Sequence, residues 1–170
     1  MLMLNVGCGT DYREGYINID GSPAICPDKI IDMNNDSLLD YFEKGTIDFI
    51  LANDIIEHFF HWQAVALLND FYLLLRSGGG GEIRVPDCDF ILNTWHVSIE
   101  EKITYLYGGQ DIPQGYNSRM DASRRVQPHF FCHKFGWTKS SMSKELQNTG
   151  FNVYDIRSEN VDFIISFRKP

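Results

Sequence analysis

A glycine turn followed by an acidic strand end is the first place in this sequence where residue types and spacing could do chemistry. The segment from Leu2 to Val6 reads as a short buried strand, Gly7-Cys8-Gly9 breaks it, and a second apolar strand then ends in Asp20. Glycine accepts positive φ and, lacking a Cβ, lets a ligand lie against the backbone. An acid at a neighbouring strand tip can accept hydrogen bonds from both ribose hydroxyls. The pattern predicts a nucleoside site, although Gly-x-Gly also occurs in simple turns.

Two later motifs give this turn a wider context. LANDIIEHF occupies residues 51–59, and GGEIRVPD occupies residues 80–87. Together with LNVGCG at the start, they make the chain resemble the class I S-adenosylmethionine-dependent methyltransferases, especially small bacterial and viral members, from Leu2 to about Arg168. The resemblance implies an α/β fold: a Rossmann-like, doubly wound, mostly parallel seven-stranded sheet that closes with a C-terminal antiparallel strand pair. It also implies S-adenosyl-L-methionine as cofactor and S-adenosyl-L-homocysteine as product.

The first motif departs from the family pattern in three ways. Asn5 replaces the usual acid two residues before the first glycine, and Asp11 stands where a third glycine is common. Only residues 10–15 separate the turn from the second strand, and at about 1.5 Å per residue they cannot form a three-turn helix, so we expect a shortened first crossover. Asp20 follows Gly7 by 13 residues. Dinucleotide folds use a spacing of about 20, which disfavours a nicotinamide-dependent oxidoreductase.

The resemblance assigns cofactor contacts to the ends of the first four strands. Asp32 and Met33 end a short strand that begins at Lys29, and they would meet the adenine amino group and ring; alternatively, Asp32 caps a loop. Asn53 follows the apolar strand 47–52 at the sheet edge where open α/β folds bind ligands, and we favour it over Asp54 for the methionine portion. The full predicted cofactor set is Asn5, Gly7, Cys8, Gly9, Asp20, Asp32, Met33 and Asn53.

Candidate general bases are Asp87, His58 and His133, in that order. Methyl transfer is an in-line displacement, so alignment and exclusion of water matter most. A carboxylate or imidazole near the methyl group can remove a proton from a hydroxyl or amine acceptor. Asp87 follows Pro86 at the end of the fifth strand, where it either faces the methyl group or caps a helix that begins near Asp89. His58 is expected to be packed or to face the substrate.

No metal site is predicted. His58 and His61 have a spacing that one helical face could present, but no acid-rich second half of a site is evident near them. His129, Cys132 and His133 form one short cluster that offers at most three ligands, without a partner C-x-x-C.

A net basic segment points to the methyl acceptor. Residues 1–100 hold 5 basic and 16 acidic side chains, whereas residues 101–170 hold 10 basic and 7 acidic ones. Arg119, Arg124 and Arg125 lie in a predicted surface loop, 110–128, inside an aromatic-rich insertion at 88–137 that the family uses on its acceptor side. The arginines form either a solvated face or a clamp for a carboxylate or phosphate. The second alternative predicts O- or N-methylation of a small anionic acceptor.

Composition sets the wider limits. The 170 residues, 44% of them hydrophobic, suit one domain spanning 1–170. We expect a cytoplasmic protein, because no membrane-length apolar run or signal sequence is present and four scattered cysteines suit reduced thiols. The net charge of −8 argues against long nucleic acid as partner. A homodimer is left open, as is the alternative of a catalytically inactive methyltransferase-like subunit that binds cofactor or acts through a partner.

The remaining helices and strands are predicted from hydrophobic periodicity and from the glycines and capping residues at their ends. We expect helices over 36–44, 62–76, 89–106 (one broken helix or two short ones) and 138–149. Gly78 to Gly81 should end the second of these helices before a strand over 82–85. Two closing strands are predicted over 151–158 and 161–168.

Overall fold

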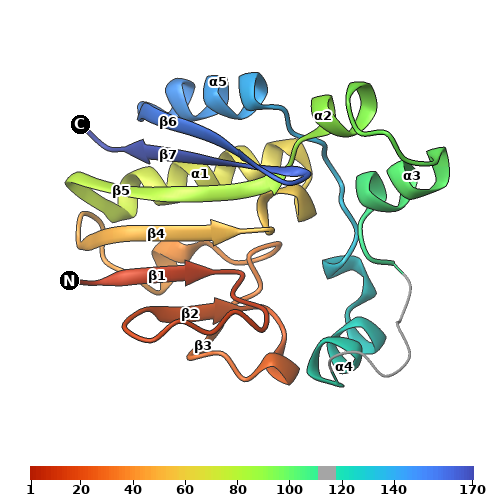
Figure 1. Cartoon of the computed structure of the whole chain (residues 1–170). Coiled ribbons are helices and arrows are strands. Elements are labelled where there is room, and N and C mark those ends of the chain that lie inside the picture. Colours follow the sequence, from red (N-terminus) through yellow and green to blue (C-terminus); the bar gives the residue numbers. More distant parts are fainter. Residues whose placement is uncertain (111–117) are drawn as a thin grey trace.

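The fold is a seven-stranded mixed sheet with strand order β3-β2-β1-β4-β5-β7-β6 (Figure 1). The computed structural model describes residues 1–110 and 118–170. β7 runs antiparallel to β5 and β6, and the other neighbouring pairs are parallel. This is the predicted Rossmann-like topology, wound outward from β1 in both directions. The strands are β1 (Met3–Val6), β2 (Ile17–Asp20), β3 (Lys29–Ile30), β4 (Ile47–Asn53), β5 (Leu75–Pro86), β6 (Asn152–Glu159) and β7 (Asp162–Arg168).

The helices are unevenly distributed along the chain. Every α-helix of the described residues follows β4, and the earlier connections contain only 3₁₀ turns. The two short helices expected between 89 and 106 are present as α2 and α3. The helices are η1 (Pro23–Ile25), η2 (Leu38–Asp40), η3 (Ile56–His58), α1 (His61–Leu74), α2 (Cys88–Asn93), α3 (Ile99–Tyr107), α4 (Ser118–Val126), η4 (Pro128–Phe130) and α5 (Lys139–Thr149).

One face of the sheet, here called the helical face, carries the hydrophobic core. α1 contacts both η2 and α5, so these helices share one side of the sheet, behind the strands in Figure 1. Side chains alternate between the faces along each strand, and residues in register share a face. Val6 is in register with Ile19, and Ala52 is in register with Ile83 and Ile165 on the strands beyond. All five are fully buried members of one core cluster.

The opposite face, here called the open face, is mostly polar. The next register line joins Asn5, Asn18, Leu51, Glu82 and Ser166 across the same strands. Leu51 is buried but does not belong to the core cluster. In the described part of the chain no α-helix packs over these positions, because the connections that would supply one are a loop and η1.

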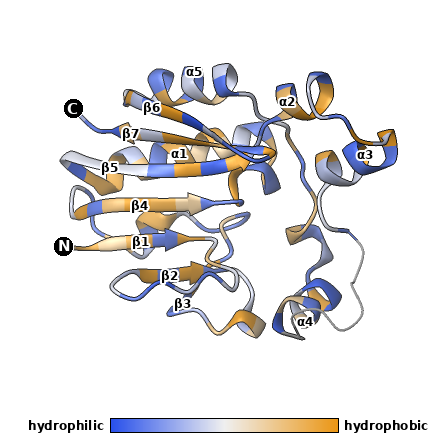
Figure 2. Cartoon of the chain, in the orientation of Figure 1, coloured by the Kyte–Doolittle hydropathy of each residue, from blue (hydrophilic) through white to orange (hydrophobic). Residues whose placement is uncertain are grey.

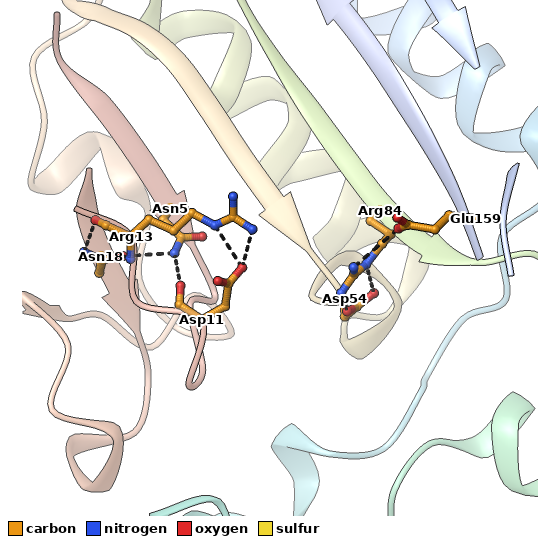
Figure 3. Close-up of polar contacts among 7 residues, drawn as sticks. All are labelled: Asn5, Asp11, Arg13, Asn18, Asp54, Arg84 and Glu159. Carbon is orange, nitrogen blue, oxygen red and sulfur yellow. Dashed lines mark hydrogen bonds and ion pairs between the residues drawn. The ribbon is translucent and has the colours of Figure 1, made fainter. Parts of the chain in front are cut away.

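The shortened first crossover is confirmed, and two asparagines fasten it to the open face (Figure 3). Asn5 Nδ2 donates to the carbonyl oxygen of Asp11 at 2.7 Å and to Oδ1 of Asn18 at 2.9 Å. Asn18 accepts from the backbone N–H of Arg13 and donates to the carbonyl oxygen of the same residue. The amides thus anchor a loop where an ordinary Rossmann fold has a helix. This contact needs a donor at Asn5, which explains why an acid is absent there.

Gly78 to Gly81 do not end a helix, and that prediction was wrong. α1 ends at Leu74, and the glycines lie inside β5. A Cβ at Gly80 would lie 2.6 Å from the carbonyl oxygen of Phe167, and one at Gly81 would lie 2.4 Å from that of Ile50. Side chains cannot fit between these closely approaching strands, so the glycines serve strand packing.

Residues 87–110 and 118–137 build a separate layer beyond the carboxyl ends of the parallel strands (Figure 1). Both termini lie at the opposite edge of the sheet. The surface loop predicted over 110–128 was wrong for residues 118–126, which form α4; residues 111–117 lie outside the described residues. Figure 2 shows α4 as a largely hydrophilic helix, and its few apolar residues give no helical period that the sequence could reveal.

Among residues 1–110 and 118–170, no helix combines the length and apolar character needed to cross a bilayer. Cys8, Cys26, Cys88 and Cys132 are all free thiols, in agreement with the expectation of reduced cysteines.

Candidate cofactor and acceptor pocket

A cavity of about 270 Å³ lies between the strand ends and the insertion. Its floor comes from the turns after β1, β2, β3 and β4, and its roof comes from α4, η4 and the segments beside them. The carboxyl edge of an open α/β sheet, where the strand order reverses, is the usual ligand site of such folds. The lining residues are Gly7, Gly9, Asp20, Gly21, Ile25, Ile31, Asp32, Met33, Asn34, Asp54, Ile55, His58, Phe59, Gly109, Met120, Ser123, Arg124, Phe130, Phe131 and His133.

The glycine turn after β1 provides backbone that a ligand can approach. Gly7 has φ +67°, and a Cβ there would lie 2.4 Å from Ile55, so only glycine fits against the end of β4. Gly9 also has positive φ, but a Cβ there would meet nothing within 4 Å. The open space beside Gly9 is therefore available to a ligand.

Asp20, the last residue of β2, is hydrogen-bonded to the glycine turn that follows β1. Its Oδ2 accepts from the backbone N–H of Gly9 at 2.9 Å, and its Oδ1 accepts from that of Ser22 at 2.8 Å. Burial raises the pKa of this carboxyl, against the lowering effect of these two hydrogen bonds. Each carboxylate oxygen keeps further acceptor capacity. Asp20 is thus fixed at the cavity wall in a form that can receive hydroxyl donors.

Asp32 and Met33 line the same cavity after β3, although β3 itself is shorter than predicted. Asp32 accepts from the backbone and side chain of Asn34 and from the side chain of Asn35. Burial opposes its charged form, but these hydrogen bonds outweigh burial and lower the pKa of Asp32. The carboxylate therefore orders its own loop, as the alternative interpretation of Asp32 expected, while it also faces the cavity.

Three predicted cofactor residues do not line this cavity. Asn5 is buried in the crossover contact described above. Cys8 lines a second cavity with Thr10 and Tyr12, and burial raises the pKa of its thiol to about 12. Asn53 is the last residue of β4, and it is Asp54, the next residue, that reaches the cavity. The sequence missed Asp54 because the choice between two adjacent polar residues depends on how the strand ends.

Asp54 belongs to a charged group at the open face (Figure 3). It has φ +53° and pairs with the guanidinium of Arg84, which also lies 3.5 Å from Glu159. Burial and the neighbouring Asp54 raise the pKa of Asp162 to about 6. This network fixes the end of β4 beside the cavity.

The three arginines predicted to bind the acceptor are not together. Arg124 lines the main cavity, Arg119 lines the second cavity, and Arg125 is exposed and lines neither. The guanidinium of Arg124 lies over the ring of Phe131 at 4.7 Å and 3.5 Å from Asp121. Its Nε and Nη1 are buried and make no hydrogen bond within the described residues. Arg124 can therefore offer buried donors to an anion in the cavity.

The roof is tied to the floor by close contacts. Phe130 packs closely against Gly21: a Cβ on Gly21 would lie 2.9 Å from the ring of Phe130. Gln127 donates to the carbonyl oxygen of Gly21 at 3.4 Å, and Lys134 Nζ donates to Oδ1 of Asn34 at 3.1 Å. These contacts hold the insertion over the carboxyl ends of β2 and β3.

His58 and His133 both line the cavity, and their ring centroids are 4.9 Å apart. Burial, and then the neighbouring His133, lower the pKa of His58 to about 4; burial also lowers the pKa of His133. Glu57 lies directly beneath them, 2% exposed, with its Oε1 3.9 Å from Nε2 of His133. Burial raises the pKa of the Glu57 carboxyl well above its usual range. Nothing in the sequence predicted Glu57 at the site, because its position beneath the cavity depends on the distant His133.

Asp87, the first predicted base, lies outside the cavity lining. It is the N-cap of α2, where its carboxylate accepts from the backbone N–H of Phe90 at 3.3 Å. Lys139 Nζ lies 3.2 Å from the same carboxylate. These contacts agree with the alternative interpretation of Asp87 as a helix cap.

Comparisons with known proteins identify the fold. No family model matches the sequence, and no curated protein matches it. Among solved structures, a putative S-adenosylmethionine-dependent methyltransferase from Listeria monocytogenes superimposes with a TM-score of 0.62 at 12% identity, covering 99% of this chain and 91% of that one. The Burkholderia thailandensis 1,6-didemethyltoxoflavin-N1-methyltransferase, bound to its substrate and S-adenosylhomocysteine, gives 0.61 at 13% identity, covering 99% and 70%.

A third similar structure is a putative methyltransferase from Haloferax volcanii in complex with the Trm112 methyltransferase activator, with a TM-score of 0.65 at 11% identity, covering 99% of this chain and 82% of that one. The chain therefore has the class I S-adenosylmethionine-dependent methyltransferase fold that its sequence resembles. Many activities share one fold, so the activity of this chain depends on the residues of the pocket.

Proposed function

We propose that this protein is an S-adenosylmethionine-dependent methyltransferase that acts on a small anionic acceptor. The observation that carries the proposal is that the glycine turn, Asp20, Asp32 and Met33 line one cavity. The residues fit the cofactor: Gly9 leaves open space for the methionine portion, Asp20 can accept both ribose hydroxyls, and Asp32 with Met33 borders the adenine position. Asp54 replaces Asn53 in this proposal, whereas Asn5 and Cys8 serve the structure of the turn.

The cofactor supplies an electrophilic methyl carbon, and the protein has to align the acceptor with it and keep water out. The contacts of Phe130 with Gly21 and of Lys134 with Asn34 hold the roof that excludes water. His58 and His133 are the imidazoles nearest the acceptor end, and they would position the acceptor there. Asp87 takes a structural role in this proposal, as the cap of the insertion's first helix.

Calorimetric titration with S-adenosylhomocysteine tests the cofactor site. The wild-type protein should bind it, and Asp20→Ala should weaken binding more than about tenfold, because hydrogen bonds to a charged carboxylate contribute about 1.5–3 kcal/mol. Asp40→Ala is the control, because Asp40 is an exposed carboxylate that lines neither cavity. Equal affinity in wild type and Asp20→Ala would remove Asp20 from the site.

Arg124 is the group that selects an anionic acceptor in this proposal. Arg124→Gln should weaken acceptor binding, most strongly at low ionic strength, and should leave S-adenosylhomocysteine affinity almost unchanged. Arg125→Gln is the matched control, because Arg125 is the adjacent residue and is exposed. Acceptors would be found by screening a metabolite pool for methyl transfer. If the best acceptor is neutral, or if both variants bind it as the wild type does, the anion site is refuted.

The alternative function is a methyltransferase-like subunit that holds the cofactor and acts through a partner. The shortened first crossover and the uncovered open face favour it, and the Haloferax volcanii structure contains such a fold with an activator. Methyl transfer by the purified chain alone would decide against this alternative.

A further inference from the structure

A buried carboxylate without a partner marks a site that the methyl-transfer proposal does not use. Oε1 and Oε2 of Glu57 are both inaccessible to solvent, and neither makes a hydrogen bond within the described residues. A buried, unpaired carboxylate is costly, and such groups are normally paired, protonated or bound to metal. Arg84 contributes attraction, but its guanidinium bonds to Asp54 instead. Glu57 is therefore a buried acceptor that lacks a cation.

Two imidazoles approach this carboxylate from different parts of the chain. The ligand atoms of Glu57, His58 and His133 all lie within 4.8 Å of one another. In a tetrahedral site, bonds of about 2.0–2.2 Å to the metal ion place the ligand atoms about 3.3–3.6 Å apart. Small side-chain rotations would close the remaining gap, and the cavity beside the histidines leaves room for them.

Each of the two imidazoles makes a hydrogen bond with the backbone. His58 Nδ1 lies 3.2 Å from the carbonyl oxygen of Cys132, and the imidazole also makes a hydrogen bond with the backbone of Asp54. His133 makes a hydrogen bond with the backbone of Tyr105. Metal-binding histidines generally donate their other ring N–H to a carbonyl or carboxylate, which fixes the tautomer and the ring orientation.

We propose that Glu57, His58 and His133 bind a divalent transition-metal ion such as Zn²⁺ or Mn²⁺ at the acceptor end of the pocket. Two imidazoles and one carboxylate suit these ions, and three protein ligands leave a coordination position open. That position faces the cavity, where it could take an oxygen of the acceptor. The role toward the acceptor rests on the proposed methyltransferase function, whereas binding of the metal does not.

The test is equilibrium dialysis of the chelator-stripped full chain against Zn²⁺ or Mn²⁺, with the bound metal measured by mass spectrometry. We expect one ion per chain, and affinity at least about tenfold lower in Glu57→Gln and in His133→Ala. His129→Ala is the control, because His129 belongs to the same roof but is exposed and lies outside the cluster. A Co²⁺ absorption spectrum that disappears in Glu57→Gln would identify the carboxylate as a ligand.

The outcomes separate this inference from the proposed function. Each variant is also titrated with S-adenosylhomocysteine, which should bind as to the wild type and so reports an intact fold. No metal binding by the wild type, or equal binding by all variants, overturns the metal site and leaves the cofactor proposal standing. Metal binding without S-adenosylhomocysteine binding would leave the metal site standing and overturn the cofactor proposal.

Discussion

The two faces of the central sheet are built from the same strands but stabilised in different ways. On the helical face, Ile83 and its neighbours pack against α1, η2 and α5 with no solvent exposure. On the open face, the neighbouring register line carries two asparagines, a glutamate and a serine, joined in pairs by hydrogen bonds. A Rossmann fold can therefore lose the helices over part of one face if polar side chains replace the apolar ones there.

This comparison also explains the unusual first motif. Where a helix is replaced by a six-residue loop, the sheet must hold the loop through specific donors and not through apolar packing. Asn5 and Asn18 provide these donors. The departure from the family's acid is therefore a structural adaptation, and it does not by itself count against cofactor binding.

The largest loss of stability is expected for a substitution in the core on the helical face. Ile83→Ala should lower the free energy of unfolding by about 3 kcal/mol, because it leaves a sealed cavity in the core. Leu51→Ala on the open face, where water can enter the space, should cost about half as much. Urea denaturation with both variants measures the difference. Equal costs would mean that the open face is packed as tightly as the core.

Asn5→Asp, which restores the family's usual acid, should destabilise the protein by about 2 kcal/mol. The new carboxylate has no donor and would face two acceptor oxygens, those of Asp11 and Asn18. Asn152→Asp, at an exposed position, is the control and should change stability little. An Asn5→Asp variant as stable as the wild type would contradict the role given to the amide.

Asp162→Asn should stabilise the protein at high pH. The pKa of Asp162 is raised to about 6, so the folded protein holds this proton more tightly than the unfolded chain does. Its contribution to stability is present at low pH and is lost as pH rises through about 6. Allowing for solvent screening at this partly exposed site, the variant should gain about 1 kcal/mol at about pH 8 and nothing near pH 4. Denaturation at both pH values checks this, and a gain of equal size at both would refute it.

The smallest effect is expected for Arg157→Gln. Arg157 pairs with Glu82 and Asp155 at 3.1 Å on the open face, and its side chain is 45% exposed. Exposed pairs of this kind contribute about 0.5 kcal/mol and are screened by salt. The loss of stability should therefore disappear at high ionic strength. A loss that persists there would show that Arg157 acts by packing.

The floor of the cavity, formed by the turns at the strand ends, was largely predictable from the sequence. Gly7, Gly9, Asp20, Asp32 and Met33 all line the cavity. Each belongs to the end of a short apolar strand, and the strand ends of a parallel sheet lie at one edge. Local sequence therefore fixes both the residues and their common location. The shortened crossover followed in the same way, from the length of a six-residue segment.

The roof of the cavity was decided by tertiary structure. α4 lacks an apolar period, so its sequence resembles a loop, and only its packing places Arg124 inside the pocket while Arg125 faces solvent. Histidines that are close in sequence predicted no metal site, whereas the fold joins His133 to Glu57 and His58 from a distant segment. Strand order and side-chain direction at a strand end depend on the whole sheet. Short-range patterns determine which residues end a strand, but only long-range packing determines which of them meet.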